Sequence, residues 1–381
     1  MIIIFVGFLF RVFLSINHLY LGGIPGVGLD YMSFHQEGIA YSNFITEAGI
    51  FNLNNEGYGY RIGWYYSVFL GFVYNIFGDS ILLGSILSCI VWLISALIFR
   101  NILIKIKIKR NLMSIALFIY TFVFPISIVY TSITLREVYM LCFVNLILLL
   151  SINILNTKKI FSYSNIINIF FIVVSFVLFM CLHRANIISS VMLLILCLMY
   201  YLQNQIRLKL FYIIIMGIAL VFYLEQSKIL ESLFDQVITY QSGHFKESTR
   251  YRASYYDKND IASTTYSFIN FLIHSSKNIG NYFIQPSIFR VSNMLDVVLL
   301  VENFMRISII FISILRFFKK FDNKTIFNIA LLFLLIMEIT YAQSTVNWGT
   351  ASRHHVQSIG LYLILFFFPH KRFFTVKNNE K

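Results

Sequence analysis

The chain has 381 residues, of which 58% are hydrophobic and 12% are charged, and its formal net charge is +13. This composition excludes an ordinary soluble surface, because soluble domains carry about 25% charged residues. The positive charge lies in short clusters between apolar runs, which is typical of membrane topology and not of a surface that binds nucleic acid. We therefore expect an all-α, polytopic integral membrane protein with no nucleic acid among its partners.

Apolar runs along the whole sequence predict about ten spanning helices, because a helix needs about 20 apolar residues to cross the hydrocarbon core of a bilayer. The runs do not alternate between polar and apolar residues, so a membrane β-barrel is excluded. In chain order, the predicted spans are residues 2–20, 80–99, 112–130, 137–155, 161–182, 185–202, 210–224, 291–315, 325–341 and 356–369.

The apolar run at residues 62–78 decides on which side the loops lie. If it crossed the membrane, the basic loop 100–110 would face outward, whereas Lys and Arg are enriched in cytoplasmic loops. If it lies along the outer surface, Trp64, Tyr65 and Tyr66 fall at headgroup depth, where aromatic rings concentrate. We therefore predict an interfacial helix here, with both termini in the cytoplasm. The basic clusters that then become cytoplasmic are residues 100–110, 158–159, 207–209, 316–324 and 371–381.

This topology makes residues 1–381 a single membrane domain with three loops on the outer face. The loops are residues 21–79, which include the interfacial helix, residues 225–290 and residues 342–355. Charged and imidazole side chains at the outer ends of the spans join these loops. They are Arg136, Glu137, His183, Arg184, Arg353, His354 and His355. An outer arginine can simply snorkel or pair with a carboxylate. However, positive charge is disfavoured in outer loops, and a planar guanidinium grips phosphate with two hydrogen bonds, so we interpret the group as a phosphate-binding site.

The first outer loop supplies candidates for a general base. A base for sugar transfer needs a carboxylate or an imidazole near the acceptor hydroxyl. Asp30 follows the first span most closely and is next to aromatic residues, so it is the first candidate; the alternative is a solvated acidic loop. His183 and either His354 or His355 are alternative bases.

The long outer loop mixes cations with aromatic residues around Arg250 and Arg252. Tyrosine rings stack on sugars and arginines neutralise phosphate, so this composition suits a lipid-linked sugar, although it is also ordinary for an exposed loop. The sequence has neither a ligand spacing for a metal cage nor a glycine-rich phosphate loop. We expect no metal and no soluble cofactor.

Some charged residues fall well inside predicted spans, where each needs a partner. Glu302 and Arg306 are four residues apart on one helix, a spacing that predicts an ion pair. Glu338 has no obvious partner in the sequence, and two roles are open for it: pairing with Arg11 or facing the cavity.

The order of these features resembles the GT-C superfamily of membrane glycosyltransferases. The resemblance rests on a Phe-Gly step ending at Gly78, the outer turn 132–137, the stretch 285–287 and the entry 347–355 to the last span. Within that superfamily the chain is most similar to O-antigen polymerases of the Wzy type. It departs from the GT-C mannosyltransferases in lacking a Pro-Pro pair and an adjacent acidic pair at Asp30, which favours an arginine-centred mechanism.

The resemblance implies a polysaccharide polymerase of the bacterial inner membrane, with its active site facing the periplasm. Its substrate would be a polyprenyl-diphosphate-linked oligosaccharide, and its partners would be membrane lipids and a chain-length regulator protein. The functional arginines that it implies are Arg250, Arg252, Arg290 and Arg353. Two alternatives stay open: a GT-C enzyme that uses a polyprenyl-monophosphate sugar, and a flippase or other transporter of lipid-linked oligosaccharides. Transporters often carry inverted repeats and broken midplane helices, and the sequence gives no sign of either.

Overall fold

The computed structural model describes most of the chain, and every structural statement below concerns these residues. They are residues 1–21, 23–24, 27, 30–49, 65–157, 163–183, 185–193, 231–232, 235, 238–239, 267–318, 324–345 and 347–369.

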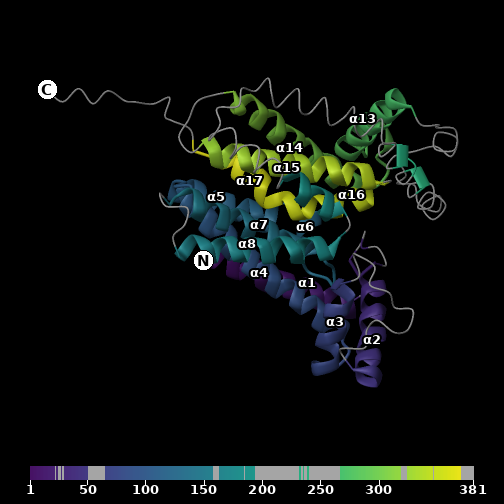
Figure 1. Cartoon of the computed structure of the whole chain (residues 1–381). Helices are drawn as coiled ribbons and strands as arrows, with labels where there is room; N and C mark the ends of the chain where they lie inside the picture. The colour runs from purple at the N-terminus through teal and green to yellow at the C-terminus, as the bar shows by residue number, and fades with distance from the viewer. Residues whose placement is uncertain are drawn as a thin grey trace.

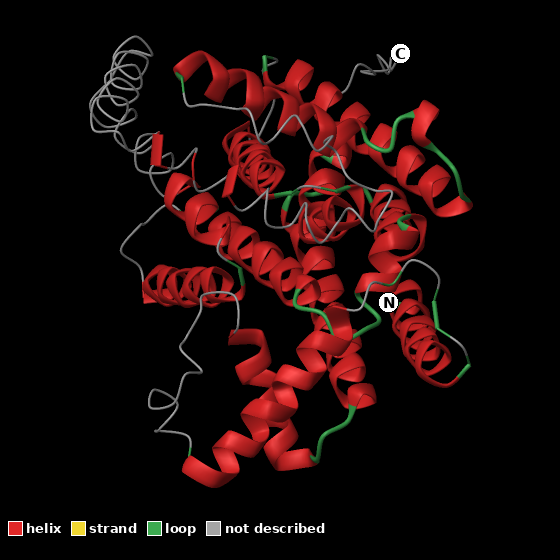
Figure 2. Cartoon of the chain, turned by 90° about the vertical axis from the view of Figure 1, so that its right-hand side faces the viewer, coloured by secondary structure: helices red, strands yellow, loops and turns green. Residues whose placement is uncertain are grey.

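The described elements are all helical, as Figure 2 shows. In chain order they are α1 (Ile2–Tyr20), α2 (Asp30–Ala48), α3 (Tyr65–Phe77), α4 (Ile81–Lys105), α5 (Arg110–Phe118), the π-helix η2 (Ile119–Val123), α6 (Pro125–Tyr130), α7 (Glu137–Leu155), α8 (Tyr163–Leu182), α13 (Phe268–Ile284), the 3₁₀ helix η3 (Ile288–Arg290), α14 (Met294–Phe317), α15 (Lys324–Ser344), α16 (Trp348–His354), the 3₁₀ helix η4 (His355–Ser358) and α17 (Ile359–Phe367).

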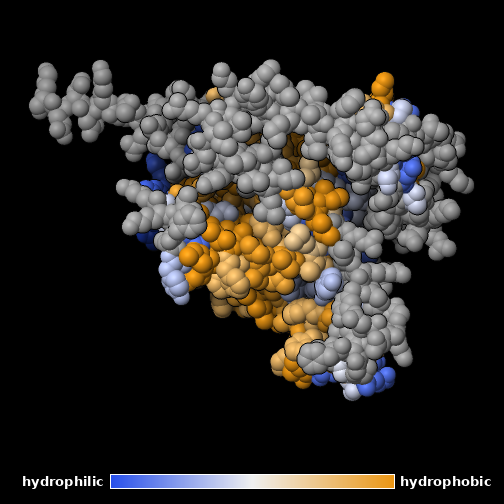
Figure 3. Space-filling view, in the orientation of Figure 1, coloured by the Kyte–Doolittle hydropathy of each residue, from blue (hydrophilic) through white to orange (hydrophobic). Residues whose placement is uncertain are grey.

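Six helices of the described part are long and apolar enough to cross a membrane, namely α1, α4, α7, α8, α14 and α15. They confirm a polytopic, membrane-embedded, all-helical protein. Their outward faces are apolar: α8, for example, exposes Phe170, Val173 and Val177. Figure 3 shows apolar side chains across the middle of the visible face and hydrophilic ones toward its edges. Such a surface is suited to lipid.

The described residues contain six candidate spans and not the predicted ten or so. The predicted span 112–130 is broken by a π-helix and by Pro125, whose missing N–H prevents an unbroken helix. The predicted span 356–369 contains the nine-residue α17, which continues from α16 through a 3₁₀ turn. Span 185–202 is described, as helix, only to residue 193, and span 210–224 lies outside the described residues.

Arg11, on α1, is fully buried and donates hydrogen bonds to the broken span at residues 112–130 and to Thr131 just after it. Its Nε donates to Thr131 Oγ1 at 2.8 Å, and Nη1 and Nη2 both lie 3.3 Å from the carbonyl oxygen of Thr121 in the π-helix. Nη1 also donates to Gly7 O at 3.2 Å. The guanidinium carbon lies 3.6 Å from the centroid of the Trp92 ring on α4. Arg11 therefore joins α1 and α4 to the break in the span between α5 and α6.

The bundle has two chemically different ends, which we call the basic end and the site end. The basic end holds the C-terminus of α4, the N-terminus of α5 and the C-terminus of α14, where Arg316 donates to the carbonyl oxygens of Leu365 and Phe366 at 3.0 and 2.8 Å. The site end holds the N-termini of α4, α7 and α14 and the C-termini of α1, α8 and α15 (Figure 1).

The α2–α3 hairpin projects from the site end (Figure 1). Its helices pack closely, and Ser67 Oγ donates to Glu37 Oε2 at 2.5 Å while His35 Nδ1 lies 3.1 Å from Tyr74 Oη. Helix α3 has 13 residues, or about 20 Å at 1.5 Å per residue, which is too short to cross a bilayer core. Helix α3 is thus a shorter apolar helix and not one of the six candidate spans of the described part, and the interfacial position of the run at residues 62–78 stays a prediction. Helix α2 lies in the part of residues 21–79 for which the sequence predicted a loop.

Candidate functional site

Arg353 lies between two carboxylates at the site end. Its Nη1 forms an ion pair with Asp30 Oδ2 at the first residue of α2, and its Nε lies 3.4 Å from Glu137 Oε1 at the first residue of α7. The side chains of Arg353 and Glu137 are 12% and 0% exposed, whereas that of Asp30 is 57% exposed. Burial lowers the pKa of Arg353 to about 10, which leaves the guanidinium charged at neutral pH. The pair with Asp30 is thus the part of the arrangement that solvent reaches.

Helix α16 holds Arg353 in this place through a cap at its N-terminus. Asn347 Oδ1 accepts a hydrogen bond from Thr350 N at 2.7 Å, as expected for an asparagine at the N-cap. Arg353 and His354 follow in the last turn, where cations suit the negative end of the helix dipole.

Arg136 adds a second cation beside Glu137. Its Nη1 donates to the carbonyl oxygen of Leu182 at 3.2 Å, which joins the start of α7 to the end of α8. Its guanidinium also lies 5.4 Å from the ring centroid of Phe34 on α2. We call Asp30, Arg136, Glu137, Arg353 and His354 the Arg353 cluster.

His354 is the buried imidazole of this cluster. Its Nδ1 lies 3.0 Å from Thr345 Oγ1, and its ring centroid lies 4.5 Å from that of Tyr341 and 5.3 Å from that of His183. Burial lowers the pKa of His354 well below its usual range, and the neighbouring His183, Arg353 and Arg136 act in the same direction. The imidazole is therefore neutral at physiological pH.

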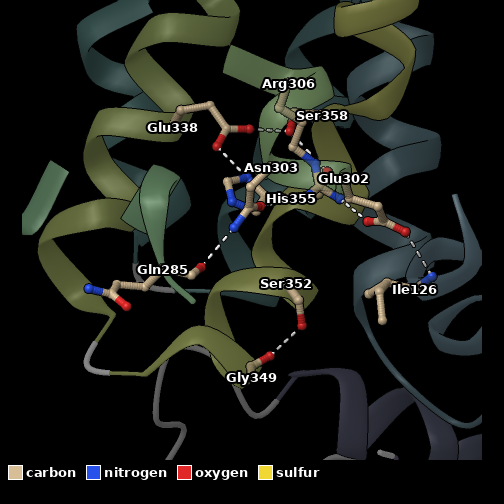
Figure 4. Close-up of polar contacts among 10 residues, drawn as sticks. All are labelled: Ile126, Gln285, Glu302, Asn303, Arg306, Glu338, Gly349, Ser352, His355 and Ser358. Carbon is tan, nitrogen blue, oxygen red and sulfur yellow. Dashed lines mark hydrogen bonds and ion pairs between the residues drawn. The ribbon is translucent and has the colours of Figure 1, made fainter. Parts of the chain in front are cut away.

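A second set of polar side chains is buried further inside the bundle (Figure 4). His355 Nδ1 lies 2.7 Å from Glu338 Oε2, and Ser358 Oγ donates to the other carboxylate oxygen of Glu338. Beside them, Arg306 forms an ion pair with Glu302, which also accepts from Ile126 N at 3.1 Å. Glu302, Arg306, Glu338, His355 and Ser358 together form what we call the Glu338 network.

Asn303 connects this network to the turn before α14. Arg306 Nη1 donates to Asn303 Oδ1 at 2.8 Å, and Asn303 Nδ2 donates to the carbonyl oxygen of Gln285 at 2.7 Å. The ring of Tyr282, on α13, lies 4.3 Å from that of His355 between centroids. The network therefore holds η4 against α13, α14 and α15.

The Glu338 network bears on two sequence predictions. The ion pair of Glu302 and Arg306 is confirmed. Glu338 pairs with His355 and Ser358, so the option of a pair with Arg11 was wrong. The physical reason is that Arg11 already donates hydrogen bonds to the hydroxyl of Thr131 and to the carbonyl oxygen of Thr121 in the broken span.

The predicted site residues are only partly brought together. Six of them meet at the site end: Asp30, Arg136, Glu137, His183, Arg353 and His354. His355, adjacent to His354 in sequence, instead bonds Glu338 in the inner network. Arg290 lies in η3 with its guanidinium 4.9 Å from the centroid of the Trp348 ring. Arg184, Arg250 and Arg252 lie outside the described residues.

Sequence reasoning missed several polar residues that support the site. Tyr341 Oη donates to Asn186 Oδ1 and lies 3.1 Å from Gln357 Oε1, beside the ring of His354. The available signal was the presence of amide side chains within apolar runs, where an unpaired polar group is costly. Within the described part of the chain, no group of three or more His, Cys, Asp or Glu residues is arranged to hold a metal ion.

No protein-family model, no curated protein and no solved structure matches the chain.

Proposed function

We propose that this protein is a membrane glycosyltransferase that acts on lipid-linked glycans, and specifically a polysaccharide polymerase of the O-antigen type. It transfers a polyprenyl-diphosphate-linked glycan to the next lipid-linked repeat unit at the periplasmic face of a bacterial inner membrane. The observation that carries the proposal is the convergence of Asp30, Glu137 and Arg353, from three distant parts of the chain, at one end of the bundle.

The arrangement suits an anionic leaving group. Arg353 is bound on its buried side by Glu137, and on its exposed side by Asp30. An exposed ion pair is weak, because solvent screens it, whereas a diphosphate offers more charge and two or more acceptor oxygens. In the proposed mechanism the donor diphosphate replaces the Asp30 carboxylate on Arg353, while Glu137 keeps the guanidinium in place.

The exchange releases a base at the position where one is needed. The freed Asp30 carboxylate accepts the proton of the acceptor hydroxyl, the acceptor oxygen forms a bond to the anomeric carbon of the donor glycan, and the bond from that carbon to the diphosphate oxygen breaks. The leaving group is the polyprenyl diphosphate, whose developing charge Arg353 and Arg136 stabilise. Among the candidate bases, Asp30 is favoured because it is exposed, whereas His354 is buried and engaged with Thr345.

The distribution of charge supports the proposed sidedness. Lys105, Lys107, Lys109 and Arg110 lie at the opposite end of the bundle from the Arg353 cluster. Because Lys and Arg concentrate in cytoplasmic loops, the proposal assigns that end to the cytoplasm and the Arg353 cluster to the periplasm.

Reconstituted protein tests the proposal directly. Purified protein in vesicles without a membrane potential receives synthetic polyprenyl-diphosphate-linked repeat units, and the products are separated on a gel. Wild type should give a ladder of lengthened glycans. Arg353→Lys, which keeps the charge but loses the planar fork, should leave single repeats, and the matched variant Arg110→Lys at the basic end should give the wild-type ladder.

Three results would overturn the proposal. An unchanged ladder from Arg353→Lys would remove Arg353 from the site. Transfer of single sugars from a polyprenyl-monophosphate donor, without elongation, would favour the monosaccharide transferase. Movement of the lipid-linked glycan between leaflets without any new glycosidic bond would identify a transporter.

A further inference from the structure

Helix α13 is amphipathic in the opposite sense to a helix on a water-facing surface. The residues that it buries are His274, Asn278 and Tyr282, which recur every four residues along one face. Several large apolar residues lie on the other face and are exposed: Ile269 is 68% and Ile273 is 61% exposed. The exposed Ser276 and Lys277 follow one turn later.

The buried face is held by specific polar contacts. Asn278 Nδ2 donates to Gln343 Oε1 at 3.1 Å, and Gln343 Nε2 donates to the carbonyl oxygen of Ser275 at 3.3 Å. The ring of Tyr282 packs on that of His355 with 4.3 Å between centroids. These contacts fix which face of α13 points inward, so the outward exposure of its apolar residues follows from the fold.

The exposed apolar surface continues beyond α13. In η3, Ile288 and Phe289 are 74% and 98% exposed, and at the start of α14 Met294 is 76% exposed. From there the surface merges with the outward face of α14, where Phe304 is 71% exposed. Helix α14 is one of the helices long and apolar enough to span, so this surface leads along the chain to a membrane-spanning face, with the exposed polar residues Arg290, Ser292 and Asn293 between them.

We propose that the exposed face of α13 and η3, formed by Ile269, Leu272, Ile273, Ile288 and Phe289, is a lipid-binding surface that lies against the acyl chains of the bilayer. Lipid against this face explains the reversal of polarity. Exposure of an apolar face to water is unfavourable, whereas contact with acyl chains is favourable. In this arrangement α13 lies between the lipid and the Glu338 network.

Spin-label accessibility tests the proposal in the full chain in phosphatidylethanolamine–phosphatidylglycerol vesicles. The label is placed by Ile273→Cys, in a background in which the native cysteines are replaced by alanine. Phe304→Cys on α14 gives the lipid reference and Lys109→Cys at the basic end gives the water reference. The label at position 273 should collide with oxygen more than with a nickel chelate, in a ratio like that of Phe304→Cys and several-fold above that of Lys109→Cys.

Other outcomes contradict the proposal. A ratio equal to that of Lys109→Cys would mean that water covers the face, and low collision with both reagents would mean that protein covers it. Photolabelling of the unmodified protein with a membrane-confined diazirine, mapped by mass spectrometry, provides a readout that needs no substitution. Adducts at Ile269, Leu272 or Ile273 are expected, and their absence while Phe304 is labelled would also overturn the proposal.

Discussion

The Asp30 carboxylate at the start of α2 pairs with the Arg353 guanidinium of α16, 323 residues later in the chain. Glu137 holds the same guanidinium from the inside. The exposed pair is the exchangeable one, since Asp30 is 57% exposed and Glu137 is fully buried. Asp30 thus occupies the position on Arg353 that the proposed mechanism assigns to the donor diphosphate.

Asp30→Asn should therefore separate substrate binding from catalysis. Loss of the competing carboxylate should lower the KM for the diphosphate-linked donor, while loss of the base should lower kcat by about 10²- to 10⁴-fold. Initial rates of glycan elongation against donor concentration measure both constants. Glu47→Gln, an exposed acid at the far end of α2, is the matched control and should leave both unchanged. An increase in KM at unchanged kcat would contradict the exchange.

Glu302 and Arg306 should be energetically coupled. Arg306→Leu leaves the Glu302 carboxylate buried without its ion-pair partner, although Ile126 N–H still donates to it, so a loss of about 3–5 kcal/mol is expected. The double variant Glu302→Leu/Arg306→Leu removes both charges and should be more stable than Arg306→Leu alone. Unfolding followed in mild detergent measures both variants, and a double variant that is no more stable than Arg306→Leu would show that the two charges do not stabilise one another.

Gly360 should tolerate no side chain. An alanine Cβ at this position of α17 would overlap Asn145 Oδ1 on α7, and Asn145 Nδ2 donates to Ser95 Oγ at 2.9 Å. Gly360→Ala should therefore cost about 1–3 kcal/mol, as overpacking does. Gly280→Ala is the matched control, since its Cβ would meet nothing within 4 Å, and it should gain about 0.5–1 kcal/mol from helix propensity. Melting temperatures that shift equally would contradict the predicted overlap.

Stability should fall in mildly acidic solution because of His354. Its pKa in the folded protein is lower than the value of about 6.5 for an exposed histidine, so below that pH the unfolded chain binds more protons. Stability from this residue is complete above about pH 6.5 and is lost as the pH falls below it. His35, His274 and His355 also have lowered pKa values and contribute in the same sense. His354→Gln should flatten, without abolishing, the decrease in melting temperature between about pH 7 and pH 5. An unchanged slope would show that His354 is not protonated on unfolding.

Local patterns in the sequence predicted the parts of this structure that depend on near neighbours. The spans at α1, α4, α7, α8, α14 and α15 follow from the length of apolar runs. The pair of Glu302 and Arg306 follows from a spacing of four residues. The gathering of Asp30, Glu137 and Arg353 was anticipated only as a consequence of topology, because all three were expected on one side of the membrane.

Two kinds of contact could not be predicted from the sequence: those that depend on which face a helix turns toward its neighbours, and those that depend on where a helix is interrupted. His354 and His355 are adjacent, yet they enter different clusters because neighbouring side chains of a helix point about 100° apart. Glu338 finds its partner on that same 3₁₀ turn, and no periodicity marks the turn in advance. In the apolar run 112–130, Pro125 indicates a break, whereas nothing in the local pattern indicates the π-helix before it or the contact of Thr121 with the buried Arg11.

The position of Arg11 has a consequence for how the protein is made. A guanidinium at the centre of a spanning helix costs about 2.5–3.5 kcal/mol during insertion by the translocation machinery. The groups that receive it, on Trp92, Thr121 and Thr131, are synthesised 81, 110 and 120 residues later. Until these residues have been synthesised, Arg11 has only the carbonyl oxygen of Gly7, in its own helix, among the partners described above. The first helix can therefore complete its packing only after the chain has been made as far as Thr131.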